Sequence, residues 1–208
     1  MKKVVSILLI SAVSLLCFSL DLRAEKPWGV TLFYGQLTET HFEEIFYTRS
    51  KLEERFMLSG MLRRELGSVR EMIDWAPRRL YLDAEGGLVH KWGDWKGIDQ
   101  RFQEAVLSAN LRYDPGANLL GLSGISLGNG FSYATKKPEY EKEITLNDQT
   151  SRLLYYMMVE MAFHLPSFSH WELAFRVHHR SGFYGLINEV RGGSNYLGFG
   201  LRYNFASF

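Results

Sequence analysis

The sequence is poor in cysteine, which cross-links a chain, and in proline, which interrupts its regular structure. It contains one cysteine, Cys17, and only five prolines among 208 residues. Cys17 lies in an apolar run near the amino terminus, so a chain cleaved after Ala24 has no cysteine. Such a chain forms no disulfide, and its fold must depend on packing and hydrogen bonds.

An excess of one charge is also lacking. The net charge is +1 and 23% of the residues are charged, which leaves no polycationic footprint for nucleic acid. His90 and His164 are isolated, without a second ligand at a metal-site spacing. We therefore expect no nucleic-acid partner, no metal and no cofactor.

Beyond Ala24 there is no apolar run of the length that a membrane-spanning helix needs. The first residues differ: Lys2 and Lys3 precede the apolar run 4–20, and Leu22-Arg23-Ala24 follows. This pattern predicts a signal peptide over residues 1–24, since the run is too short for an uncleaved anchor. Residues 25–208 then form a single domain.

Alternation of apolar and polar residues recurs along the remaining chain. It is clearest at 152–164, where one face is apolar or aromatic while the other carries Glu160 and His164. Successive side chains of a strand point to opposite sides of a sheet, so this period of two indicates β-strands. The stretches 171–178 and 196–205 alternate in the same way.

Eight segments of strand length follow from this pattern. Ionisable residues stand in mid-strand opposite the apolar face, where a soluble sandwich would bury them and a membrane barrel places them in its lumen. We therefore predict an all-β fold, an eight-stranded antiparallel outer-membrane β-barrel, with a lumenal charge network rather than a channel filter. The charged residues are Asp83, Glu85, Glu104, Glu160 and Arg176, and the strands are expected near 28–37, 54–66, 78–92, 100–113, 119–134, 152–164, 171–178 and 196–205.

The connections alternate in length. The segments 114–118 and 166–170 are typical of periplasmic turns, and the charged stretch 136–151 is typical of an outer loop. The segment 67–77 is expected to form a short helix in one of the turns. The chain ends on an apolar alternation with terminal Phe208, a pattern typical of the assembly signal of outer-membrane barrels.

A candidate for chemistry lies at the end of the seventh predicted strand. Alternation puts His179 and Ser181 on one face, with an imidazole able to reach a hydroxyl two positions along. The parity of Trp171 and Val177 makes that face the lipid-facing one, where a polar pair is costly unless the substrate is itself a membrane lipid. Ordinary interfacial His and Ser residues are the alternative.

Two stretches carry a resemblance to a known family. The segments 171–183, WELAFRVHHRSGF, and 192–205, GGSNYLGFGLRYNF, resemble the acyloxyacyl hydrolase family, the lipid A 3-O-deacylases of the PagL type. Further pieces are similar to the broader family: WGVTLFYGQ at 28–36, LGNGFSYAT at 127–135 and PEYE at 138–141. The resemblance spans most of the chain after residue 24.

The resemblance implies an outer-membrane barrel that hydrolyses an ester-linked acyl chain of lipid A, with serine as nucleophile, histidine as general base and an acidic residue orienting the histidine. The first two roles fall on Ser181 and His179. The family's glutamate falls here at Gly193, so Glu189 is the substitute we expect, with a solvated loop charge as its alternative. Where the family tends to have asparagine after the serine, this chain has Gly182, whose backbone N–H remains as an oxyanion donor.

The leading hypothesis is thus a lipid A deacylase of the cell outer membrane with a Ser-His catalytic pair. Its expected partners are lipid A or lipopolysaccharide as substrate and the surrounding bilayer, with a homodimer left open. The alternative is a non-catalytic barrel with a structural or loop-mediated binding role. A second enzymatic reading, acyl transfer from phospholipid, predicts acyl chains gained by lipid A rather than lost.

Overall fold

The computed structural model describes residues 27–47, 49–116 and 121–205. The predicted signal peptide, with Cys17, and the terminal Phe208 lie outside the described residues. In chain order the elements are β1 (Trp28–Thr38), η1 (Phe42–Phe46), β2 (Leu52–Ser68), α2 (Val69–Met72), β3 (Leu80–Trp95), β4 (Ile98–Asp99), β5 (Phe102–Tyr113), β6 (Leu122–Ala134), α3 (Glu139–Ile144), β7 (Leu153–Leu165), β8 (Phe168–Ser181) and β9 (Gly193–Phe205).

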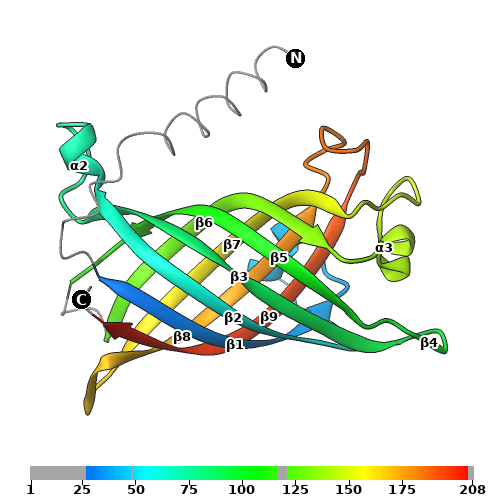
Figure 1. The fold of residues 1–208 in the computed structure, drawn as a ribbon, viewed down its shortest axis with the longest axis horizontal. Coiled ribbons are helices and arrows are strands. Elements are labelled where there is room, and N and C mark those ends of the chain that lie inside the picture. The colour runs from blue at the N-terminus through cyan, green and yellow to red at the C-terminus, as the bar shows by residue number, and fades with distance from the viewer. Residues whose placement is uncertain (1–26, 48, 117–120, 206–208) are drawn as a thin grey trace.

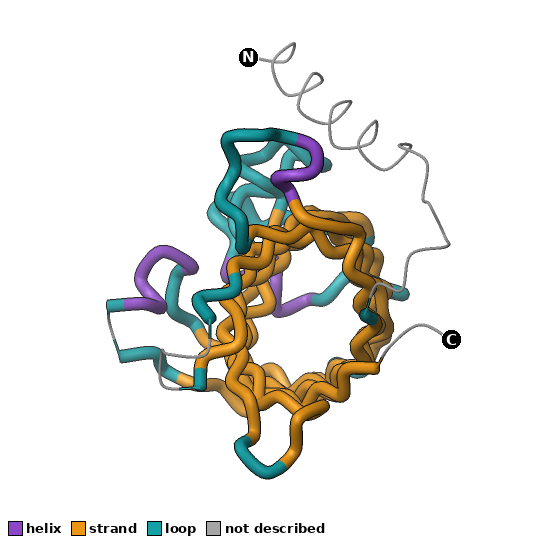
Figure 2. The backbone as a smooth tube through the Cα atoms, turned by 90° about the vertical axis from the view of Figure 1, so that its left-hand side faces the viewer, coloured by secondary structure: helices purple, strands orange, loops and turns teal. Residues whose placement is uncertain are grey.

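Eight long strands form a closed antiparallel barrel (Figures 1 and 2). Each long strand pairs with the next long strand along the chain, and β1 also pairs with β9, so the first and last strands close the sheet. The two-residue β4 only extends the hairpin between β3 and β5. The prediction of eight antiparallel strands is confirmed, and closure gives every long strand a partner on both sides.

The connections agree only in part with the predicted alternation of short and long. The connection 69–79, at the end where β1 begins, is longer than the connection 96–101 at the opposite end, and β6 begins at Leu122 rather than at 119. The β7–β8 turn also differs. This turn is shorter than 166–170, because a register shift at His164 and Leu165 lets pairing continue to Leu165 and Phe168. The predicted helix within 67–77 is α2, and Ser68 caps it by accepting a hydrogen bond from the Arg70 N–H. The stretch 136–151 carries α3, which lies with β4 at the end opposite the start of β1 and the end of β9 (Figure 1). We call this the α3 end.

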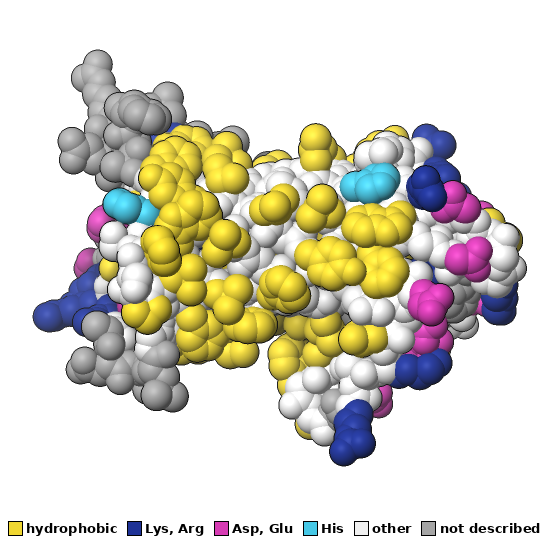
Figure 3. Space-filling view, turned by 90° about the horizontal axis from the view of Figure 1, so that it is seen from below, with side chains coloured by type: hydrophobic (Ala, Val, Ile, Leu, Met, Phe, Trp, Pro, Cys, Tyr) yellow, Lys and Arg dark blue, Asp and Glu magenta, His cyan; other side chains and the backbone are white. Residues whose placement is uncertain are grey.

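The two faces of the barrel wall differ in chemistry. Exposed large apolar side chains recur at alternate positions of the strands, and they gather over the middle of the wall while charged groups lie mostly near the ends (Figure 3). None of the described helices is long and apolar enough to cross a membrane. Examples of the exposed apolar side chains are Leu32, Leu62, Leu88, Leu107, Leu127, Met161, Phe175 and Phe199.

The inward face carries the predicted charge network. The Arg176 guanidinium donates to both carboxylate oxygens of Glu85, at 2.8 and 2.9 Å, and to Glu160 at 2.8 Å. Arg202 bridges Glu160 and Glu172, with a distance of 3.2 Å to the latter. Because burying an unpaired charge is costly, this mutual pairing is what makes a charged lumen tolerable. The predicted network is confirmed.

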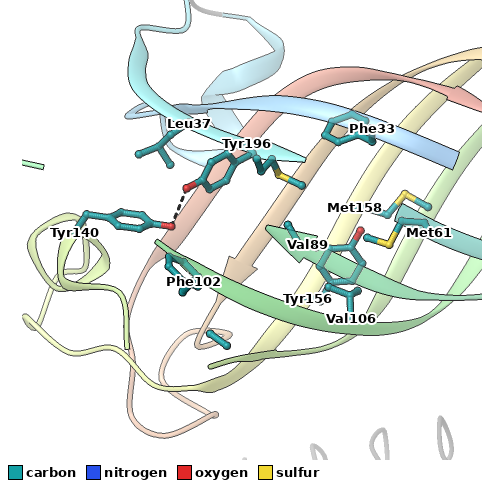
Figure 4. Close-up of a cluster of buried hydrophobic side chains, with 12 residues drawn as sticks. Phe33, Leu37, Met61, Val89, Phe102, Val106, Tyr140, Tyr156, Met158 and Tyr196 are labelled. Carbon is teal, nitrogen blue, oxygen red and sulfur yellow. Dashed lines mark hydrogen bonds between the residues drawn. The ribbon is translucent and has the colours of Figure 1, made fainter. Parts of the chain in front are cut away.

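Side chains also fill the α3 end of the lumen. Tyr140 of α3 and Tyr196 of β9 share a hydrogen bond of 3.0 Å between their hydroxyls, beside Leu37 and Phe102 (Figure 4). The Arg55 guanidinium lies 4.1 Å from the centre of the Tyr140 ring. Burial, reinforced by Tyr196 and Glu141, raises the pKa of Tyr140 well above its usual value, so its hydroxyl keeps its proton.

Removing the central cation should destabilise the barrel. In Arg176→Met the carboxylates of Glu85 and Glu160 remain buried without their shared partner, and we expect a loss of about 3–5 kcal/mol in unfolding free energy. Urea unfolding in detergent micelles measures it. The control Arg70→Met changes an exposed arginine of α2 and should stay within about 0.5 kcal/mol of wild type. Equal losses in both variants would contradict the role given to Arg176.

Candidate functional site

His179 and Ser181 lie at the α3 end of β8 and face outward. The intervening Arg180 and the preceding His178 are fully buried and point into the lumen, where His178 contacts Glu104 at 3.0 Å. His179 is half-buried, and Ser181, the last residue of β8, is 7% exposed. The predicted parity of this pair is therefore confirmed.

Asn195 of β9 is the group that orients the histidine. It lies directly opposite His179 in the strand register, and its Oδ1 is 2.6 Å from His179 Nδ1. The amide group of Asn195 donates to the Thr40 carbonyl at 2.8 Å. A carbonyl only accepts, so the amide nitrogen must face Thr40 and the amide oxygen must face the imidazole. His179 therefore carries a proton on Nδ1, and in the neutral imidazole Nε2 is the nitrogen without one.

The segment 39–51, between β1 and β2, completes the surroundings of His179. The Phe42 ring packs against the imidazole with 4.9 Å between ring centres. The backbone of the same segment supplies the Thr40 carbonyl. The imidazole thus contacts Asn195 through Nδ1 and the Phe42 ring at an angle of 50° between the two planes.

Glu189 has a different position from the one sequence reasoning gave it. It is exposed in the segment 182–192, with a positive φ of 60°, and its backbone carbonyl accepts a hydrogen bond from Asn147. Asn195, rather than Glu189, is the group at His179 Nδ1. Sequence reasoning missed it because the last strand was predicted to begin at 196, whereas β9 begins at Gly193. A hairpin register extended to the end of β8 would have paired Asn195 with His179.

The expectation that the Gly182 N–H serves as an oxyanion donor is wrong, because this N–H donates to the Gly192 carbonyl at 3.2 Å. A Cβ at Gly182 would lie 2.0 Å from the Val190 carbonyl oxygen, so the asparagine of the family pattern has no room here. The Phe183 N–H points instead to Ser181 Oγ, at 3.4 Å. This N–H is the donor nearest to the hydroxyl among the contacts of the described residues.

An apolar groove on the outer wall adjoins the pair. Its volume is about 510 Å³, and it lies between the segment 39–51, which contributes Phe46 and Ser50, the start of β2 at Leu52, and the outward faces of β1, β7, β8 and β9. Val177 and Leu197, which line it, face each other in the register. They are the outward pair next to His179 and Asn195, so the groove comes within one outward pair of the imidazole.

The arrangement supplies a hydroxyl and an oriented base beside an apolar groove. Ser181 and His179 are two positions apart on one strand face, about 6.6 Å between their Cα atoms. Within the part of the chain that the structure describes, no group of three or more His, Cys, Asp or Glu side chains is placed to hold a metal ion. A serine hydroxyl and an oriented imidazole are the residue types that nucleophilic attack assisted by a base requires.

Comparisons with known proteins bear on the fold. The sequence matches neither a protein-family model nor a curated protein sequence. Among solved structures, the barrel is similar to one described as the crystal structure of the outer membrane enzyme PagL, with a TM-score of 0.52 over 84% of this chain and 98% of that chain. At 12% identity the likeness shows the fold alone. The chain thus has a PagL-type barrel, as the resemblance implied.

The orientation of Asn195 predicts the tautomer of His179. We expect ¹⁵N NMR of the labelled imidazoles to show neutral His179 protonated at Nδ1, and Asn195→Leu to shift it toward the Nε2-protonated form. His170, exposed at the other end of β8, should keep its signals in the variant. A wild-type His179 protonated at Nε2 would contradict the assignment.

The crowding at Gly182 leads to a prediction about stability. Gly182→Ala forces the segment 182–192 to shift, and we expect a loss of about 1–3 kcal/mol in unfolding free energy, as for other overpacked sites. Gly60→Ala is the matched control, because a Cβ at Gly60 meets nothing within 4 Å. Urea unfolding of both variants in micelles decides it, and an unperturbed Gly182→Ala would refute the crowding.

Proposed function

We propose that this PagL-type barrel is an outer-membrane ester hydrolase that removes an acyl chain from lipid A, with Ser181 as nucleophile and His179 as general base. The observation that carries the proposal is the position of the pair. An oriented imidazole and a serine hydroxyl share the outward face of β8, at one end of an apolar groove on the wall. A polar pair on this face is useful to an enzyme whose substrate is itself a membrane lipid.

The wall supports a location in the outer membrane. The long strands have between 11 and 17 residues, and a tilted strand needs about 9–11 to cross the hydrocarbon core. The outward apolar band faces lipid and the charged lumen does not, as in other transmembrane barrels. With the termini on the periplasmic side, the α3 end lies outside and the pair faces the outer leaflet, where lipid A resides.

The reaction follows from the two side chains. Nε2 of His179 takes the proton of Ser181 while Oγ attacks the ester carbonyl, and the resulting oxyanion is stabilised by an N–H donor, for which Phe183 is our candidate. The imidazolium then gives its proton to the departing alkoxide, which leaves the acyl chain on Ser181. Water attacks this second ester with His179 again as base, and the free fatty acid leaves.

Asn195 supplies one of the two services that a carboxylate would give. Its oxygen holds the ring in the useful tautomer, which an asparagine fails to do when its NH₂ faces the ring. It carries no charge, so it does not stabilise the imidazolium as an acid does. We therefore expect an enzyme slower than one with a complete triad. In our proposal Asn195 takes the orienting role that we expected for Glu189 as a substitute for the family's acid.

The groove suits the acyl chain. Its lining is mostly apolar, and its place on the outward wall puts a bound chain beside the lipids from which it comes. The ester carbonyl then lies toward the α3 end, near His179 and Ser181. Binding of this kind fixes the reacting carbonyl against the nucleophile, which is itself a large contribution to rate.

Mass spectrometry of lipid A from expressing cells tests the proposal. Wild type should remove one hydroxyacyl mass, whereas Ser181→Ala should lower the rate roughly 10⁴-fold or more, because the nucleophile is gone. Ser169→Ala is the matched control, an exposed serine at the other end of the same strand, and it should retain full activity. Heat-modifiable migration of each variant checks that the barrels fold.

The alternatives predict other results. Lipid A that is unchanged by wild type, in cells and again as extracted lipid in detergent, would favour a non-catalytic barrel that binds through its loops. A gain of acyl mass would favour transfer from phospholipid. Activity that survives Ser181→Ala would reject Ser181 as the nucleophile.

A further inference from the structure

One buried carboxylate, that of Glu141, binds both β8 and β9, the strands that carry the candidate site. On β8 and β9 the outward pair His179 and Asn195 is followed by the inward pair Arg180 and Ser194. The next outward position of β8 is Ser181. The inward pair therefore lies between the imidazole and the hydroxyl along β8, on the other side of the wall.

Glu141 of α3 binds both members of this inward pair. One of its oxygens accepts a hydrogen bond from Ser194 Oγ at 3.0 Å, and the other accepts from the Arg180 guanidinium. Thr150 Oγ1 donates to the same carboxylate at 2.5 Å. Glu141, Arg180 and Ser194 are all completely buried, so these bonds are shielded from water.

Arg180 also forms hydrogen bonds with two further segments. Its Nε donates to Ser132 Oγ of β6 at 3.0 Å, and its Nη2 donates to the backbone carbonyls of Ser151 and Arg152, at 2.8 Å to the latter. Together with Glu141, these contacts anchor the last residues of β8 to β6, to α3 and to the start of β7. A strand end otherwise tends to open first, because it has few buried contacts.

We infer that Glu141 is a positioning residue for the reaction, acting through the barrel wall. It holds Arg180 and Ser194 from inside, and so fixes the backbone from which His179, Ser181 and Asn195 project outside. The segment 135–152 thereby becomes part of the active site without touching substrate. This inference rests on the proposed function, and it makes an inward-facing loop residue matter to catalysis on the lipid side.

The experiment compares Glu141→Gln with Glu85→Gln. Both variants remove a buried carboxylate that pairs with an arginine of β8, but Glu85 pairs with Arg176, away from the site. We expect Glu141→Gln to lower kcat about 10- to 100-fold with KM within about twofold of wild type, since misplacing catalytic groups slows the reacting step. Glu85→Gln, at equal folded fraction, should keep kcat within about twofold, and Glu141→Asp should restore part of the loss.

Ser194→Ala is the second variant, used in particular if Glu141→Gln does not fold. It removes one bond of Glu141 and keeps the ion pair with Arg180, and we expect kcat to fall about threefold with KM unchanged. Equal kcat losses in Glu141→Gln and Glu85→Gln, or no loss in Ser194→Ala, would overturn the inference.

The imidazole signals of His179 separate this inference from the proposed function. If wild type is inactive on lipid A, the proposed function fails, yet ¹⁵N NMR still reports whether the site is held. Glu141→Gln should then change the His179 tautomer population while Glu85→Gln leaves it unchanged. Identical His179 signals in wild type and Glu141→Gln would overturn the positioning role on their own.

Discussion

The pairing of β1 with β9 is the contact on which the rest of the structure depends. It closes the sheet, so that backbone donors and acceptors of the first and last strands find partners within the wall. It also brings the chain that leaves β1 beside the start of β9. Thr40, just beyond β1, thereby reaches Asn195, and Asn195 reaches His179 on β8. The candidate site is built across the closing seam, so it exists only in the finished barrel.

The charged lumen is the second consequence of closure. A narrow barrel leaves its inward side chains one another as neighbours, and Arg176 and Arg202 share Glu160 between them. Near the α3 end Arg180 and Glu141 likewise pair with each other inside the lumen. Arg180 lies between His179 and Ser181 on β8, on the opposite side of the wall. The positions of the lumenal and the outward side chains therefore depend on each other, since alternate residues of every strand face the two sides of the wall.

The fold was accessible from sequence because period-two alternation directly determines which way each strand residue faces. Alternation predicts the strands, the lumenal charges and the outward parity of His179 and Ser181. It failed where contacts depend on register and loop path. Asn195 is opposite His179 only through the pairing of β8 with β9, and the partner of the Gly182 N–H depends on how the segment 182–192 turns back. Alternation alone fixes neither of these.

Asn195 sets the histidine tautomer, but the group that orients Asn195 is a main-chain carbonyl, and this has a consequence for how such a site diverges. Any side chain at position 40 leaves that carbonyl in place, whereas an insertion or deletion within 39–51 would move it. The backbone path there is held by the Thr38 hydroxyl, which accepts from the Thr40 N–H at 3.1 Å, and by the bond from Glu39 to the Lys51 carbonyl at 3.2 Å. An insertion or deletion within this segment would therefore disturb the site more than a substitution at position 40.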